Sequence, residues 1–454
     1  MKKSILMAAA LLSLCTFTLS AQNKKDIVKT GYNLGPLPVI AYDADKGLQL
    51  GAILQLFDYG DGTRYPNYDS KLYLEASFFT KGSQLYQLRY DNKDLIPGVR
   101  WCSALRVDLD KAFDFYGFNG YQSYYDYGRI QAGKEGKMFQ FTPFYRMKRF
   151  AYTFKSDFLG DIGSVDNLYW EAGIFAYYHQ TGAIDYDNIN KGKSDEQKFP
   201  ETVKTLYDIY HDYGVISDSE YYGGFSSGIR LGILYDTRDK EGAPTRGIWA
   251  EAHVTAAPKF MSKNPYYRYS MTWRHYLPLV KNDVLTFAYR LNYEGTFGNV
   301  APFYVLPYMT QMGEKQDLDG MGGFFTVRGI MRSRVVGLDM ATYNAELRWR
   351  FVKFILFNQN FSVGLSAFSD GTMVTKGRDI SKLKYHDFLE NGMLLGAERD
   401  TPHITFGAGA RLIMNENFII AAEYGTPLTH FLKNSPLYNQ DGTGAFYVNI
   451  GYLF

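Results

Sequence analysis

Few residues in this 454-residue sequence are candidates for catalysis. Residues 224–228 read GFSSG and match the G-x-S-x-G pattern of a nucleophilic serine. That pattern needs a strand, a tight turn and then a helix, with a histidine and a carboxylate held nearby. Here a strand is predicted after Ser226 instead of a helix, and loop ends rich in glycine and serine produce such matches by chance. We therefore predict that the protein is not an enzyme.

Metal binding has little support in the sequence. The histidines are scattered without the paired spacing of a metal-binding helix. They are His179, His211, His253, His275, His386, His403 and His430. The acidic residues Glu314, Asp317 and Asp319 offer oxygen ligands that suit calcium, but a charged loop tip gives the same pattern. We predict neither a metal site nor a cofactor.

One further stretch combines residue types that conflict with each other. Residues 322–331 read GGFFTVRGIM, within the longest segment of the C-terminal half that does not have a strand pattern. Phe324 and Phe325 are too apolar for a loop in water, whereas Arg328 is too polar for a core strand unless it is paired. The elements around this loop must therefore provide a place that is both enclosed and charged.

Composition narrows the class of protein. The formal net charge is +2, whereas a nucleic-acid-binding protein usually has a basic excess, so we expect no nucleic-acid partner. Aromatic residues make up 17% of the chain, with 39 tyrosines, and glycine is frequent at 44 residues. Beyond the N-terminus no stretch reaches 18 apolar residues, so no transmembrane helix is expected.

The N-terminus predicts export. Residues 1–21 have two lysines, an uncharged apolar run at 5–19 and small residues before Gln22, which is the pattern of a secretory signal peptide. A lipoprotein signal at Cys15 is the alternative, but a leucine precedes it where a small residue is needed. The mature chain would keep only Cys102, so no internal disulfide is expected.

Alternating apolar and polar residues predict the fold class. Residues 338–351 would point Leu347 and Trp349 outward and Glu346 and Arg348 inward. An exported chain with charged residues on one strand face can enter a membrane as a closed barrel, because its strands satisfy each other's backbone groups. We predict an all-β fold: a 16-stranded antiparallel transmembrane β-barrel.

The predicted domains are a signal peptide at 1–21, an extended periplasmic segment at 22–46 and an outer-membrane barrel at 47–454. Prolines in Gly35-Pro36-Leu37-Pro38 argue for the extended segment. The strands are predicted at 47–59, 68–79, 83–92, 99–111, 137–148, 150–160, 168–180, 226–236, 247–257, 266–277, 283–295, 338–351, 361–370, 404–414, 418–425 and 446–454. Long connections then follow odd-numbered strands and face outside, except 112–136, which this strand count puts on the periplasmic side.

Four motifs in the same order as in a known family carry a resemblance. The sequence resembles the sixteen-stranded BamA/TamA-type surface-antigen barrels of the outer membrane. The motifs are the VRG-aromatic loop motif at Val327, Arg328, Gly329 and Ile330; a D-x-R-D…P-x-x-G turn at Asp236, Arg238, Asp239, Pro244 and Gly247; FYGFNG at 115–120; and G-x-G-x-R…E-Y-G from Gly407 to Gly425. Isoleucine stands where the loop motif usually has an aromatic residue, and Glu423 stands where the strand pair usually has Asp.

The resemblance implies an inward-folded sixth extracellular loop. Its arginine, here Arg328, would pair with acidic groups on the inner wall, which are Asp370, then Glu423, and Glu346 in this sequence. It also implies a weakly paired lateral seam between the first and last strands, here 47–59 against 446–454. Gly451 would ease a kink in that last strand, and the aromatic end at Phe454 is similar to an outer-membrane insertion signal.

The resemblance further implies a role in inserting or translocating proteins, or lipids, at the bacterial outer membrane. Expected partners are outer-membrane lipid, lipopolysaccharide and unfolded outer-membrane or surface proteins. Most of the family has POTRA domains before the barrel; we expect no counterpart of them here, so a periplasmic accessory protein is a further expected partner. A passive porin-like channel and an outer-membrane receptor remain the alternatives.

Overall fold

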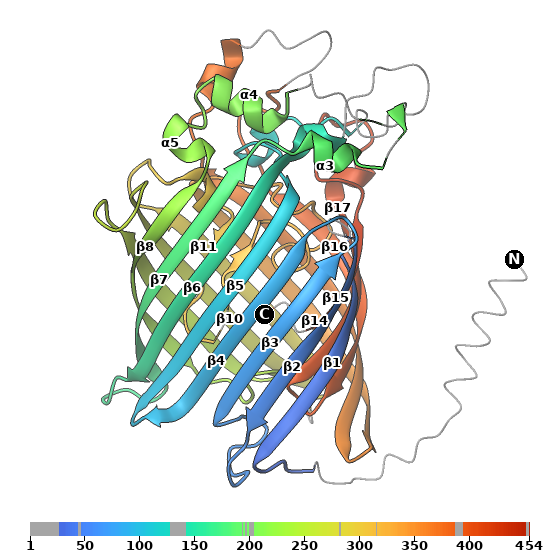
Figure 1. The fold of residues 1–454 in the computed structure, drawn as a ribbon. Helices are drawn as coiled ribbons and strands as arrows, with labels where there is room; N and C mark the ends of the chain where they lie inside the picture. The colour runs from blue at the N-terminus through green and yellow to red at the C-terminus, as the bar shows by residue number, and fades with distance from the viewer. Residues whose placement is uncertain are drawn as a thin grey trace, which may run out of the picture.

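Sixteen strands of the described part of the chain close into one antiparallel barrel (Figure 1). The computed structural model describes residues 27–454, except 44–46, 128–141, 193, 196–197, 199–203, 281–282, 315, 386–393 and 451–453. The predicted signal peptide at 1–21 therefore lies outside the described residues. No helix in the described part is long and apolar enough to span a membrane.

The barrel strands pair with their neighbours in chain order, and β11 pairs with β14. They are β1 Tyr32–Asp43, β2 Gly47–Asp58, β3 Ser70–Phe79, β4 Gln84–Ile96, β5 Val99–Asp114, β6 Arg146–Asp161, β7 Leu168–Gly182, β8 Gly224–Asp236, β9 Gly247–Ala257, β10 Tyr266–Val280, β11 Leu285–Thr296, β14 Asp339–Leu356, β15 Gln359–Lys376, β16 His403–Met414, β17 Phe418–Pro427 and β18 Ala445–Ile450. Two short strands, β12 Tyr308–Met309 and β13 Leu318–Asp319, pair within the β11–β14 connection.

Side chains alternate between the outer face and the lumen, as the sequence predicts. In β14, Leu347 and Trp349 are exposed on the outside, whereas Asn344, Glu346 and Arg348 are buried in the lumen. A period of two residues places successive side chains on opposite faces of the wall. The outer face is therefore apolar and the interior charged, which is the arrangement expected of a barrel surrounded by lipid.

The predicted number of strands is correct, but two individual predictions were wrong. Residues 32–43, predicted to be an extended segment outside the barrel, form β1, so the barrel begins before residue 47. The strand predicted at 137–148 lies partly outside the described residues, and its described end contains a 3-10 turn followed by the start of β6. Pro36 and Pro38 misled the prediction, because proline is excluded from central strands but tolerated on an edge strand.

With β1 included, the long β5–β6 connection lies at the same end as the other long loops. We call this the long-loop end and the opposite end the short-turn end. The helices α3 Tyr186–Asn190, α4 Leu206–Asp212 and α5 Asp218–Tyr221 cluster over the long-loop end (Figure 1). The 3-10 turns are η1 Gly120–Gln122, η2 Thr142–Tyr145, η4 Phe303–Val305, η5 Ser381–Tyr385 and η6 Leu428–Phe431.

A largely aromatic cluster closes the long-loop end. Phe115 makes edge-to-face contacts with Phe118, Tyr207 and Tyr210, and also contacts Phe303 at the start of the β11–β14 loop. These residues come from three different connections and are buried together. The FYGFNG segment thus helps to join the loops into a cap.

Candidate functional site

Arg328 lies in the lumen and is fully buried, with 0% of its side chain exposed. Its Nε donates to Asp370 Oδ2 at 2.8 Å and its Nη2 to Asp370 Oδ1 at 2.9 Å. Its Nη1 donates to Glu423 at 3.0 Å and also to Glu346. The structure thus brings Arg328 together with all three carboxylates that the sequence analysis named, and we call this group the loop-6 latch.

Two more arginines balance the charge of the latch. Arg411 donates to Glu423 at 2.6 Å and to Glu346 at 2.9 Å, and Arg348 donates to Glu346 at 2.6 Å. Three guanidinium groups therefore share three carboxylates, which offsets the cost of removing these charges from water. The Arg328 guanidinium also lies 3.5 Å from the ring centroid of Phe368, a cation–π contact.

The backbone of the VRGI motif lies directly on the barrel wall. Gly329 has φ +91°, and a Cβ there would lie 2.6 Å from the backbone carbon of Gly425 in β17. Val327 and Ile330 on either side are buried. Gly329 N also donates to Tyr447 Oη at 3.2 Å, so the loop contacts β18 as well. Glycine is needed here for both the conformation and the close approach.

The D-x-R-D…P-x-x-G motif forms the β8–β9 turn at residues 237–246. Arg238 makes a two-pronged contact with Asp236, Nε at 2.9 Å and Nη2 at 2.8 Å. Asp239 accepts from the backbone N–H of Thr245 at 2.9 Å. Gly247 has φ +103°, and a Cβ there would lie 2.2 Å from a carbonyl oxygen of the same turn. Pro244 is buried, and the motif braces the turn internally.

This turn also packs across the short-turn end of the barrel, a role that the sequence did not indicate. Ala243 is fully buried against Ile413 and Ile419. Its carbonyl oxygen accepts from Arg350 Nη2 at 3.1 Å. Lys240 pairs with Asp283 of the β10–β11 turn at 3.0 Å. The β8–β9 turn therefore meets both neighbouring and distant strands at this mouth of the lumen.

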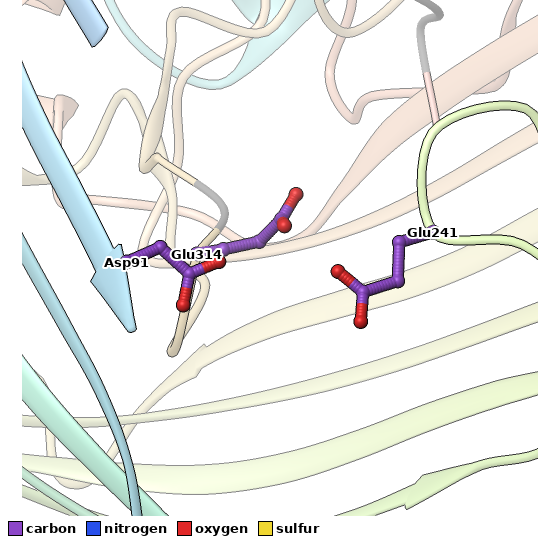
Figure 2. A group of neighbouring side chains, drawn as sticks. All are labelled: Asp91, Glu241 and Glu314. Atoms are coloured by element: carbon purple, nitrogen blue, oxygen red, sulfur yellow. The ribbon is translucent and has the colours of Figure 1, made fainter. Parts of the chain in front are cut away.

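Three carboxylates lie between the β8–β9 turn, the β11–β14 loop and β4: Glu241, Glu314 and Asp91 (Figure 2). Their oxygens approach within 4.8 Å of one another, as in a metal centre. The cations here come from the chain itself, since Arg100 Nη2 binds all three at 2.6–3.1 Å and Lys93 binds Glu241 at 2.7 Å. The group is therefore an ion-pair network that joins the β11–β14 loop to the β8–β9 turn.

Burial of Glu241 raises the pKa of its carboxyl group, but the Arg100 and Lys93 cations lower it further, so that pKa lies below its ordinary value. The carboxylate is therefore charged at neutral pH. Sequence reasoning considered Glu314 only as a calcium ligand in a loop tip. It could not identify the partner, because Arg100 is more than two hundred residues away in the chain.

The barrel is closed by β1 and β18, and among the described residues a single register pair joins them, Tyr42 opposite Val448. By contrast, β2 pairs along the whole of β1. The predicted seam of 47–59 against 446–454 was thus wrong about its first partner. Residues 47–58 form β2, which has strands on both sides, because the prolines concealed β1.

The chain end also departs from its predicted position. The alternation of apolar residues at 446–454 predicts Phe454 on the lipid-facing side of the last strand, but it is buried in the lumen with 4% exposed. Its carbonyl oxygen accepts from Arg348 Nη2 at 3.2 Å, and its ring packs with Tyr276 and Ala288. Gly451 lies outside the described residues.

Comparison with known proteins gives a family and two structural relatives. Residues 152–454 match the Omp85 superfamily domain. The fold is similar to BamA from Haemophilus ducreyi lacking POTRA domains 1–3, with TM-score 0.52 and 17% identity over 93% of this chain and 70% of that chain. It is also similar to CdiB from Escherichia coli, with TM-score 0.52 and 9% identity over 94% of this chain and 63% of that chain. No curated protein matches the chain.

Proposed function

This chain belongs to the Omp85 superfamily, and on that premise we propose that it inserts proteins into the bacterial outer membrane or translocates them across it. The short-turn end faces the periplasm and the long-loop end faces outside. Client strands enter at the seam between β1 and β18. Insertion or translocation then depends on backbone hydrogen bonds between the client and an open strand edge, and no covalent bond is cleaved.

The closure of the barrel between its first and last strands, β1 and β18, is the observation that carries this proposal. Every strand in a closed barrel has two partners, and an edge with unpaired N–H and C=O groups invites another strand. At this seam the described residues hold a single register pair near the long-loop end. Pro36 and Pro38 cannot donate a backbone hydrogen bond, so a client strand would pair with the β1 residues that retain an N–H.

A passive porin is the less favoured alternative, because the lumen is obstructed from both ends. The loop-6 latch ties the β11–β14 loop to the wall from Glu346 to Glu423, and the β8–β9 turn packs across the other mouth. A large, stable open pore of the unmutated protein in planar bilayers would favour the porin instead.

Depletion of the protein in its host, followed by proteomics of the outer membrane, tests the proposal. We expect loss of a defined set of barrel or surface proteins. An accessory protein that delivers these clients should then co-purify with the barrel. An unchanged outer-membrane proteome would argue for a channel or a receptor and against a role in assembly.

A further inference from the structure

The segment before β1 binds strands on the far side of the seam. The backbone N–H of Ile27 donates to Asn360 Oδ1 at 3.0 Å, and Asn360 Nδ2 donates back to the carbonyl oxygen of Ile27 at 3.0 Å. Lys29 Nζ donates to the carbonyl oxygen of Asn358 at 2.5 Å. In the barrel order, β18, β17 and β16 stand between β1 and β15, which contains Asn360. The segment therefore passes beneath three strands.

The β2–β3 turn at residues 59–69 makes a second crossing. Asn417, next to the start of β17, donates from Nδ2 to Tyr59 Oη at 3.1 Å and to the carbonyl oxygen of Pro66 at 2.8 Å. Asn360 Nδ2 also donates to Tyr65 Oη at 3.1 Å. These contacts again join the β1–β2 side of the seam to the β15–β17 side without using β18.

The two crossing segments are packed directly against each other. Gly31 N donates to the carbonyl oxygen of Gly60 at 2.8 Å, and Tyr59 N donates to the carbonyl oxygen of Gly31 at 3.0 Å. A Cβ at Gly62 would lie 2.8 Å from Thr30 Cγ2, so the turn lies directly on the segment.

The asparagines that bind these two segments lie at two tight hairpins on the β15–β17 side of the seam. The β14–β15 hairpin turns at Phe357 and Asn358, with φ +48° and +56°, and the β16–β17 hairpin at Asn415 and Glu416, with φ +50° and +62°. Asparagine tolerates this left-handed conformation. Asn360 N donates to Asn415 Oδ1 at 3.0 Å, which ties the two hairpins to each other.

We infer that these contacts form a clasp that closes the short-turn end of the barrel independently of β18. The clasp consists of residues 27–31 and 59–69 on one side and the asparagines Asn358, Asn360 and Asn417 on the other. It fixes the distance between β1 and β17, so that β18 leaves β1 without the barrel unrolling. This goes beyond the proposed function, since it concerns what holds the circumference whether or not any client uses the seam.

The geometry of β18 supports this separation. It pairs with β17 from Ala445 to Ile450, and Arg348 donates to the carbonyl oxygen of Phe454 in the lumen. These contacts of β18 are separate from those of the clasp, which joins β1 and β2 to β15 and β17.

Pulsed EPR distances between nitroxide labels at Leu34→Cys in β1 and Ile420→Cys in β17 test the clasp. Both side chains are exposed on the outer face, and Cys102→Ser removes the buried native thiol. Val448→Pro is introduced to weaken β18 at its described pair with β1, where Val448 lies opposite Tyr42. With an intact clasp we expect the β1–β17 distance to be unchanged by Val448→Pro. With Asn360→Ala/Asn417→Ala, the same substitution lengthens the distance and broadens its distribution.

Asn92→Ala is the matched control, because among the described residues the hydrogen bonds of the Asn92 side chain are to β4 groups, the N–H groups of Asp94 and Leu95 and the Tyr90 hydroxyl. The inference is overturned if Val448→Pro lengthens the distance equally with and without the clasp. If Val448→Pro prevents folding, judged by heat-modifiable migration, the clasp variant alone decides. It must broaden the distribution relative to Asn92→Ala, and an equal width overturns the inference.

Discussion

Arg328 shows how a single charge in a barrel lumen can be both costly and useful. A buried guanidinium without partners would be strongly destabilising, and here three carboxylates from β14, β15 and β17 bind it. Removal of one member of such a group leaves the others buried and uncompensated, at a cost of about 3–5 kcal/mol. The latch is therefore sensitive to changes of one residue.

Arg328→Ala should destabilise the barrel and release the β11–β14 loop from the wall. We expect the free energy of unfolding in urea to fall by about 3–5 kcal/mol. We also expect higher conductance in planar bilayers. Arg328→Lys should recover little, because an ammonium group lacks the fork that binds Asp370 at two oxygens. Exposed Arg399→Ala serves as control, and equal conductance of the Arg328 and Arg399 variants would contradict the latch.

Glu241 gives a pH dependence with a defined sign. Its pKa lies below the ordinary value of 4.5, so its contribution to stability is present above that value and is lost as pH falls through the lower, folded-state pKa. Glu241→Gln should therefore be less stable than the unmutated protein at pH 7. The difference between the two urea midpoints should shrink below about pH 4.5. A difference that stays constant down to pH 3 would contradict this assignment.

At the level of elements, close backbone contact holds the β11–β14 loop against β17 in addition to the ion pairs. A Cβ at Gly425 of β17 would lie 2.9 Å from the carbonyl carbon and oxygen of Arg328, closer than real contacts allow. Both partners in this contact are backbone, and backbone cannot move aside as the end of a flexible side chain can. The strand and the loop must therefore separate if anything larger than glycine occupies this position.

Gly425→Ala should displace the VRGI motif without removing any charge. We expect raised conductance and faster proteolysis within the β11–β14 loop. Gly182→Ala at the end of β7 is the matched control, because no atom lies within 4 Å of a Cβ built there. Identical proteolysis of the two variants would show that the loop does not depend on this contact.

Elements with regular alternation, such as β14, were predictable from the sequence, because a period of two residues suffices to recognise a strand. β1 was not, since its two prolines resemble a break unless one knows that the strand lies at an edge. The partners of Arg328 were named correctly because strand register and the family motifs agreed. Arg100 and the clasp asparagines were missed, because their partners are distant in sequence and no local pattern marks them.

At the level of the whole molecule, connected contacts obstruct the lumen and a separate set closes the circumference. The loop-6 latch and the β8–β9 turn obstruct the lumen, and the Arg100 network joins them. The clasp fixes the circumference at the short-turn end. At the seam, one register pair joins β18 to β1 among the described residues. The proposed function depends on the opening of this seam.

A covalent lock of the seam tests the proposed function most directly. In a Cys102→Ser background, Tyr42→Cys and Val448→Cys place thiols at paired positions of β1 and β18. The variant would replace the native protein in its host, and the outer-membrane proteome would be measured with the disulfide formed and after reduction. We predict that the locked barrel loses the same proteins as depletion does, and that reductant restores them. A locked barrel that sustains the normal proteome, in a host where depletion does not, would contradict a function that depends on opening this seam.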